Sequence, residues 1–174
     1  MKKLVMLISI LFLISGCVEP NPNLIQITLN ASIDTIELGS TYQDPGATAR
    51  YGVLILGVST DQSMLDTSKV GVYEITYTAT HKNFSKTIKR MVTIIDTTPP
   101  IITLNPGIDT LFEGEIWVDE GVTVFDQSDG EIEVIVIGSV GSSSGVYEIT
   151  YQAKDIHGNQ SSIKRFVYVI ARPS

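Results

Sequence analysis

The heptapeptide GVYEITY occurs twice, at residues 71–77 and 145–151, and this repeat constrains the fold more than any other feature of the sequence. When the chain is aligned with itself at an offset of 75 residues, residues 27–48 match residues 102–123. The match slips by one residue at the heptapeptide and recovers where IKRMVTII lies over IKRFVYVI. A self-match of this length indicates two copies of one folding unit rather than a single larger domain.

The heptapeptide itself has the period of a half-buried strand, because Tyr73, Ile75 and Tyr77 alternate with Val72, Glu74 and Thr76. The other apolar segments are short, rich in Val, Ile, Thr and Tyr, and separated by Gly, Pro, Asp and Ser. We therefore predict an all-β fold with two tandem β-sandwiches. Strands of the first unit are expected near residues 24–29, 33–38, 46–51, 53–58, 71–79 and 86–95, with equivalents about 75 residues later.

The first 17 residues have the layout of a bacterial export signal. Lys2 and Lys3 precede an apolar run that is too short for a comfortable membrane span, which needs roughly 20 residues. The run ends in LISGC, which resembles the lipobox of bacterial lipoproteins, and Cys17 is the only cysteine of the chain. The resemblance implies that residues 1–16 are a lipoprotein signal peptide and that Cys17 becomes the lipidated first residue of a tether, residues 17–22. Two folded units follow, residues 23–96 and 97–174, joined by DTTPP, whose prolines favour a short and stiff linker.

The charge excludes one large class of partners. The chain has 12 Lys and Arg against 19 Asp and Glu, and Lys2 and Lys3 lie in the predicted signal peptide. Nucleic acid is therefore not an expected partner, because binding to phosphates needs a basic face.

Three motifs carry a family resemblance: YQDPGATA, GVYEITYTAT and KRMVTIIDTTPP in the first unit, with WVDEGVTVFDQSDGEIEV, GVYEITYQAKDIHGN and KRFVYVI in the second. They resemble the tandem Ig-like domains of bacterial surface proteins, which are related to hyalin-repeat modules. The resemblance implies immunoglobulin-like sandwiches in a cell-envelope setting. Tyr73 and Tyr147 stand where Ig domains carry a tyrosine two residues before a cysteine, and here Ile75 and Ile149 replace that cysteine, so aliphatic packing is expected instead of a disulfide.

Acidic residues are concentrated in the second unit. Residues 113–133 contain eight acidic residues and no Lys or Arg. The matching residues of the first unit, 38–58, contain one acidic residue, Asp44, and one basic residue, Arg50. One interpretation is a calcium site, because hard cations bind clustered carboxylate and carbonyl oxygens, although the spacing is not that of an EF-hand. Its candidate ligands are Asp126, Asp129, Asp155 and Asn159. The other interpretation, which we favour at this point, is an Asp-Gly turn on a solvated acidic face.

Few residues suggest catalysis. His81 and His157 lie in expected loops, and the sequence contains neither GxSxG nor HExxH. Trp117 aligns with Tyr42 of the first copy, which favours an aromatic core role over a carbohydrate-stacking platform. No catalytic residue and no obligatory cofactor is therefore predicted, with calcium and a glycan ligand at Trp117 kept as alternatives.

The sequence predicts a lipid-anchored, non-catalytic envelope protein, attached to the membrane through its N-terminal lipid and facing the extracellular side or a periplasm. It would act as a spacer, adhesion or protein-interaction module whose second unit presents loops or an edge strand to an envelope protein or glycan. The alternative function is a carbohydrate- or calcium-binding accessory module that uses the acidic loops of the second unit.

Overall fold

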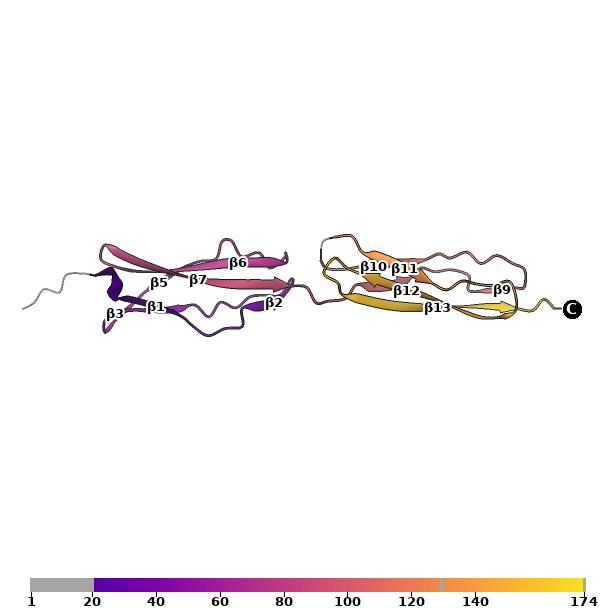
Figure 1. The fold of residues 1–174 in the computed structure, drawn as a ribbon, viewed down its shortest axis with the longest axis horizontal. Helices are drawn as coiled ribbons and strands as arrows, with labels where there is room; N and C mark the ends of the chain where they lie inside the picture. Colours follow the sequence, from indigo (N-terminus) through magenta and orange to yellow (C-terminus); the bar gives the residue numbers. More distant parts are fainter. Residues whose placement is uncertain (1–20, 129, 174) are drawn as a thin grey trace, which may run out of the picture.

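A computed structural model describes residues 21–128 and 130–173. Two β-rich domains lie end to end, with the described chain entering at one tip and leaving at the opposite one (Figure 1). Domain 1 comprises one turn of 3-10 helix, η1, and strands β1 to β7, and domain 2 comprises β8 to β13. The prediction of an all-β chain built from two tandem sandwiches is confirmed.

The elements of domain 1 are η1 (Pro22–Leu24), β1 (Ile25–Leu29), β2 (Thr35–Glu37), β3 (Ala47–Tyr51), β4 (Leu54–Leu56), β5 (Val58–Asp61), β6 (Gly71–His81) and β7 (Phe84–Ile95). Those of domain 2 are β8 (Ile101–Leu104), β9 (Thr110–Phe112), β10 (Val122–Phe125), β11 (Glu133–Ile137), β12 (Gly145–Lys154) and β13 (Gln160–Ile170).

Each domain packs two sheets against each other. In domain 1 the sheet β1-β3-β4 faces the sheet β2-β7-β6-β5, and in domain 2 the pair β10-β8 faces β11-β12-β13-β9. Ile27 of β1 packs onto a cluster that includes Ile75 of β6 and Val92 of β7, so the core of domain 1 lies between its sheets. In both domains a short strand pairs in parallel with the last strand, β2 with β7 and β9 with β13, while the other pairs are antiparallel.

The repeated heptapeptide forms the central strand of each domain. Ile75, Tyr77, Ile149 and Tyr151 are all buried, which confirms the alternation expected from the sequence. Aliphatic packing thus occupies the place of the immunoglobulin cysteine. The hydroxyl of Tyr73 donates to the Lys69 carbonyl at 2.9 Å. Tyr147 repeats this tyrosine corner in domain 2.

One predicted strand of domain 1 is wrong in detail. Residues 53–58 were expected to form a single strand, but they contribute to two, β4 and β5, which belong to different sheets. The chain changes sheets at Gly57, which lies between them. A two-residue period shows that residues are extended, but it does not say to which sheet they belong.

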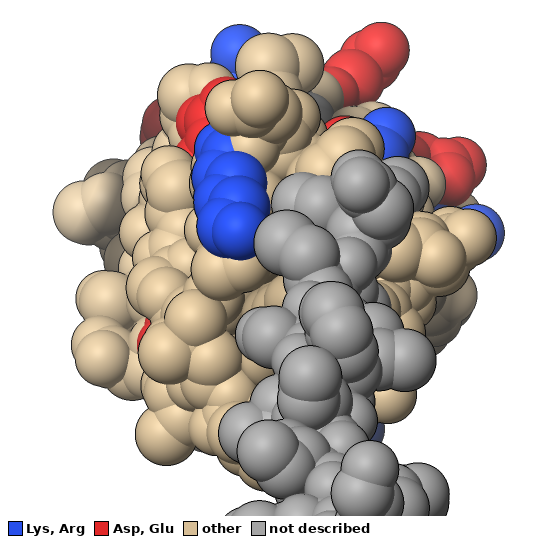
Figure 2. All heavy atoms as spheres, turned by 90° about the vertical axis from the view of Figure 1, so that its left-hand side faces the viewer, with Lys and Arg blue, Asp and Glu red and all other residues tan. Residues whose placement is uncertain are grey.

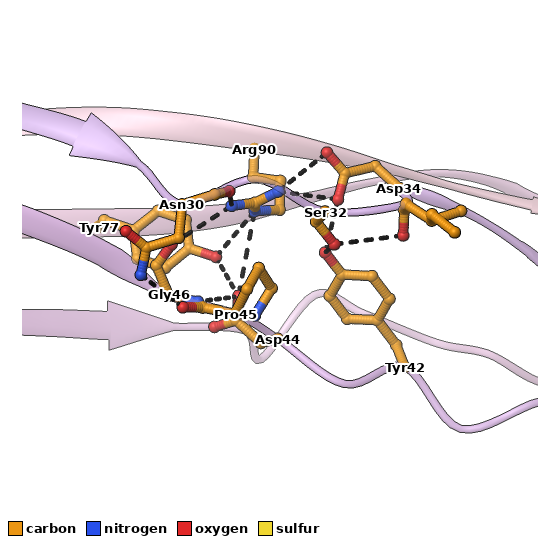
Figure 3. Close-up of polar contacts among 10 residues, drawn as sticks. Asn30, Ser32, Asp34, Tyr42, Asp44, Pro45, Gly46, Tyr77 and Arg90 are labelled. Atoms are coloured by element: carbon orange, nitrogen blue, oxygen red, sulfur yellow. Dashed lines mark hydrogen bonds and ion pairs between the residues drawn. The ribbon is translucent and has the colours of Figure 1, made fainter.

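A buried arginine joins the two sheets of domain 1 (Figure 3). Arg90 of β7 is 2% exposed and donates from Nη1 to both carboxylate oxygens of Asp34, at 2.8 and 2.9 Å. Its Nη2 donates to the Asn30 carbonyl at 2.6 Å, and its Nε donates to the Tyr77 hydroxyl at 3.2 Å. Tyr77 in turn donates to Asp44, so one guanidinium organises both carboxylates.

Domain 2 repeats most of this arrangement. Arg165 is equally buried and donates to both oxygens of Asp109, at 3.0 and 3.1 Å, and to the Asn105 carbonyl at 2.6 Å. Tyr151 donates to Asp119 at 2.5 Å. Arg165 Nε has no hydrogen-bond partner in the described part of the chain, unlike Arg90 Nε. Because both copies keep the arginine–aspartate pair and the tyrosine–aspartate bond, we assign these contacts to folding rather than to a function of one domain.

The two buried tyrosines predict a loss of stability at alkaline pH. Burial, together with the hydrogen bonds to Asp44 and Asp119, raises the pKa of Tyr77 and of Tyr151 to about 12. Between about pH 10 and pH 12 the native state therefore keeps these two protons, whereas the unfolded chain, in which the tyrosine pKa is near 10, has released them. Their contribution to stability is complete below about pH 10 and is lost as the pH rises to about 12, and chemical unfolding across this range measures it.

The matched variants for this prediction are Tyr77→Phe, Tyr151→Phe and Tyr168→Phe. The first two are expected to flatten the alkaline decline in the free energy of unfolding, whereas the exposed Tyr168 is expected to leave it unchanged. If the free energy of unfolding falls equally steeply with pH in all three variants, the decline comes from groups other than Tyr77 and Tyr151.

Candidate functional site

The joint between the domains is hydrogen-bonded on both sides. Glu37, at the end of β2, accepts hydrogen bonds from the amide and the hydroxyl of Thr97 at 2.7 and 2.9 Å. The backbone N–H of Thr97 is the main cause of a lowered pKa at Glu37, so this carboxylate is ionised at neutral pH. On the other side, the Ser161 hydroxyl donates to the Pro100 carbonyl at 2.5 Å. The linker is therefore held by domain 1 and by domain 2.

Three aspartates meet at this joint. Asp96 directly follows β7, Asp126 directly follows β10, and Asp155 lies between β12 and β13. One carboxylate oxygen of each lies within 4.8 Å of one oxygen of the other two. Asp96 is 8% exposed and Asp155 is 5% exposed, so two of the three are buried.

The partners of the three carboxylates differ. One oxygen of Asp96 accepts the Thr98 amide at 3.0 Å, and one oxygen of Asp126 accepts the Ser128 amide at 2.8 Å. The second oxygen of each, Oδ2, is buried and has no hydrogen-bond partner. Among residues 21–128 and 130–173, no ion pair involves Asp96, Asp126 or Asp155.

Asp155 is the best-supported member of the cluster. Its Oδ1 accepts the amides of His157 and Asn159, and its Oδ2 accepts the Asn159 side-chain amide, each at 2.8 Å. Burial raises the pKa of Asp155, but these hydrogen bonds outweigh it and leave the pKa below its ordinary value. The same Asn159 amide donates to the Asp96 carbonyl at 3.2 Å, which ties domain 2 to the linker.

Such a cluster is electrostatically costly as it stands. Two unit charges 4.8 Å apart repel by about 3.5 kcal/mol at an effective dielectric constant of about 20. None of the three carboxylates has a cationic partner among the described residues, so no positively charged side chain offsets this repulsion. Three converging carboxylate oxygens are also the donor set that a hard divalent cation prefers.

The structure brings together most of the residues that the calcium interpretation named. Asp126, Asp155 and Asn159 lie at one place, and Asp129 lies outside the described residues. The sequence interpretation missed Asp96, which belongs to the linker rather than to an acidic loop. The direction of the strands could have indicated it: β8 leads away from the joint, so antiparallel β10 must end there, which brings Asp126 next to the linker that contains Asp96.

The first copy provides a comparison for this site. Asn21, Tyr51 and His81 occupy the corresponding positions in domain 1. The Asn21 side chain accepts the amide two residues later at 2.9 Å, as Asp96 does. Tyr51 and His81 stack with ring centroids 4.2 Å apart. The fold thus brings the same three positions together in both domains, but only domain 2 fills all three with acids.

Trp117 packs largely against its own domain. It lies against the core cluster of Leu111, Val167 and Val169, as its counterpart Tyr42 packs on the core of domain 1. Its half-buried ring also lines a surface hollow of about 700 Å³ with Ile108, Ile116 and Val118. The indole Nε1 is buried without a partner. The structure therefore places this candidate residue in a core-supporting position at the edge of an open hollow, apart from the acidic joint.

The remaining predicted site lies beyond the described part of the chain. Cys17 falls within residues 1–20, as do the predicted signal peptide and most of the tether. Among the described residues there is no helix with the length and apolar character needed to cross a bilayer.

Solved structures similar to the chain include two-domain and multi-domain extracellular proteins. The protocadherin gammaB7 EC3-6 cis-dimer structure matches 84% of this chain at 16% identity with a TM-score of 0.38, and the chain spans 50% of its length. Human protocadherin-24 EC1-2 matches 84% of this chain and 98% of its own at 13% identity, with a TM-score of 0.44. A lipoprotein from Bacteroides thetaiotaomicron matches 83% of this chain and 99% of its own at 14% identity, with a TM-score of 0.33. No curated protein matches the chain.

The family comparison is more specific. The family model described as "Bacterial surface protein, Ig-like domain" matches residues 26–94 and, separately, residues 103–169. The two matches fall on β1 to β7 and on β8 to β13, one on each domain. The chain belongs to the bacterial surface protein Ig-like domain family and contains two of its domains in tandem.

Proposed function

We propose that the chain is a non-catalytic, lipid-anchored module of the cell envelope, in which domain 1 holds domain 2 away from the membrane to meet a protein or glycan partner. The end-to-end arrangement of the domains carries this proposal (Figure 1). The predicted lipid on Cys17 would lie a few residues before η1, at the tip of domain 1 that is farthest from domain 2. Membership in a surface-protein family supports an interaction role rather than a catalytic one.

The exposed tip of domain 1 supports a position next to a membrane. Val53 in the β3-β4 turn is fully exposed, Ile55 of β4 is 85% exposed, and Leu24 of η1 is also exposed. Figure 2 looks onto this tip, where the described surface is mostly uncharged and the charged side chains gather toward the upper part of the view. Apolar side chains at the anchored end would add buried apolar area to the membrane affinity that the predicted lipid supplies.

The anchor predicts a clear result for one substitution. Wild-type chain, expressed at full length in a bacterium that processes lipoproteins, is expected in the membrane fraction and is expected to incorporate radioactive palmitate. Cys17→Ser is expected to lose the lipid and therefore to incorporate no radioactive palmitate, because the thiol that would carry the lipid is absent. Immunoprecipitation after metabolic labelling measures this.

Ser9→Ala, in the same signal segment, is the matched control and is expected to incorporate palmitate as wild type does. Palmitate labelling of Cys17→Ser at the wild-type level would contradict lipid anchoring through this residue.

A further inference from the structure

We propose that Asp96, Asp126 and Asp155 bind one calcium ion at the joint, and that this ion fixes the orientation of domain 2 relative to domain 1. The proposal goes beyond the spacer function and does not depend on how the chain is anchored. It differs from the calcium site expected from the acidic loops alone, because a linker residue supplies one of its ligands.

The first observation is a pair of unpartnered, buried oxygens. Asp96 is more than nine-tenths buried, and its Oδ2 has no hydrogen-bond partner. Asp126 Oδ2 is buried and equally unpartnered. Native proteins satisfy nearly all buried polar atoms, so two such oxygens in one acidic cluster indicate a missing positive ligand.

The second observation is the difference between the two copies. Domain 1 brings Asn21, Tyr51 and His81 to the corresponding positions and keeps the same turn after Asn21. The sandwich therefore forms without acids at these positions. Three carboxylates at the joint, brought within 4.8 Å of one another, add a repulsion that folding does not require. A bound cation would offset that repulsion, which accounts for the presence of three acids at one place.

The set of ligands favours calcium over magnesium. Calcium takes six to eight oxygen ligands, carboxylates among them, at about 2.3 to 2.6 Å in a flexible geometry. Magnesium needs a nearly ideal octahedron at about 2.0 to 2.1 Å, and proteins usually hold it through one or two carboxylates and several waters. Three protein carboxylates whose oxygens lie within 4.8 Å of one another match the ligand set of calcium.

An ion at this place would connect the two domains. Asp126 and Asp155 belong to domain 2, whereas Asp96 follows β7 directly and the next residue, Thr97, is held by Glu37 of domain 1. An ion shared by these three carboxylates would tie the end of domain 1 to the base of domain 2. Hydrogen bonds are already present at the joint: the Asn159 side-chain amide donates to the Asp96 carbonyl, and Gln127 Nε2 donates to the Leu38 carbonyl at 3.5 Å.

Calorimetric titration of calcium chloride into the chelator-treated full-length chain, in detergent, tests the binding. We expect one ion per chain and at least tenfold weaker binding of magnesium chloride. Asp96→Asn and Asp126→Asn are each expected to weaken calcium binding at least tenfold, whereas Glu120→Gln, an exposed acid of the same domain, is expected to bind as wild type does. Absence of calcium binding, unchanged binding in both Asn variants, or equal binding of magnesium would overturn the assignment.

Thermal unfolding separates a lost site from a misfolded variant. In chelator, Asp96→Asn and Asp126→Asn are expected to unfold at or above the wild-type temperature, because each removes repulsion. Calcium at 100 times its dissociation constant is expected to raise the wild-type midpoint of domain 2 by about 10 °C or more and to leave the Asn variants nearly unchanged. An equal rise in the variants would overturn the site.

Small-angle X-ray scattering tests the effect on the joint. With calcium, the wild-type chain is expected to scatter as one extended rod with a narrower range of maximum dimensions than in chelator. Asp96→Asn is expected to give the chelator profile under both conditions. Identical wild-type profiles with and without bound calcium would overturn the proposed coupling of the domains.

Discussion

Replacing Arg90 by methionine is expected to destabilise domain 1 by about 3 kcal/mol, the lower end of the range for breaking a buried ion pair. The change leaves Asp34 without its two hydrogen bonds from the guanidinium, and it leaves the Asn30 carbonyl and the Tyr77 hydroxyl without a donor. We place the cost at the lower end because the Asp34 side chain is 35% exposed, so water can partly replace the lost partner. Denaturant unfolding, followed separately for the two domains, measures the change.

Lys89→Met is the matched control, since Lys89 is the preceding residue of the same strand. Its ion pair with Glu74 is short, 3.0 Å, but the Lys89 side chain is 60% exposed, and a pair of this kind contributes at most about 1 kcal/mol. If both variants lose the same free energy, the Arg90 network does not hold the sheets together.

Ile149→Ala is expected to destabilise domain 2 by about 2 to 5 kcal/mol, because it removes a fully buried side chain and leaves a cavity. For a domain of this size, each kcal/mol lowers the unfolding midpoint by roughly 4 to 8 °C. Thermal unfolding is expected to show domain 2 melting well before domain 1. The large effect would follow from the position of Ile149, which takes the place of the cysteine in a disulfide-linked sandwich.

Val146→Ala provides the comparison on the same strand. Val146 is 63% exposed, so its truncation is expected to cost less than about 0.5 kcal/mol. Equal losses for Val146→Ala and Ile149→Ala would mean that the inward face of β12 does not form the core.

The repeat and its two-residue alternation were enough to predict the fold. Residues such as Ile75 and Tyr77 point inward because a strand places alternate side chains on one face, and that property is local in sequence. The sheet change at Gly57 was not predictable in the same way. Pairing between strands depends on partners that are distant in sequence, and nothing local to the apolar run 53–58 shows that β4 and β5 join different sheets.

The partner of the buried Arg90 could not be predicted from the sequence. The alternation puts it on the inward face with Val92 and Ile94, but a lone arginine in such a pattern gives no sign of its partner. Asp34 lies 56 residues earlier in the chain. Only the three-dimensional arrangement shows that a bidentate pair makes this burial tolerable.

Only part of the acidic site could be predicted from the sequence. Asp126, Asp155 and Asn159 were identified because they lie in acidic or polar loops of one copy that the other copy lacks. Asp96 was missed because it stands alone in the linker, where a single acid has no pattern around it. Its place beside the other two follows from the direction of the strands that end at the joint.

The parallel pairing of the short strands β2 and β9 with the last strand of each domain determines how the molecule responds to being pulled. The chain enters each domain at one tip and leaves it at the other, so a tensile force between the two ends of the described chain runs along the strands. The hydrogen bonds between β2 and β7, and between β9 and β13, then resist as a group in shear instead of opening one at a time. A chain built in this way is suited to staying folded under tension.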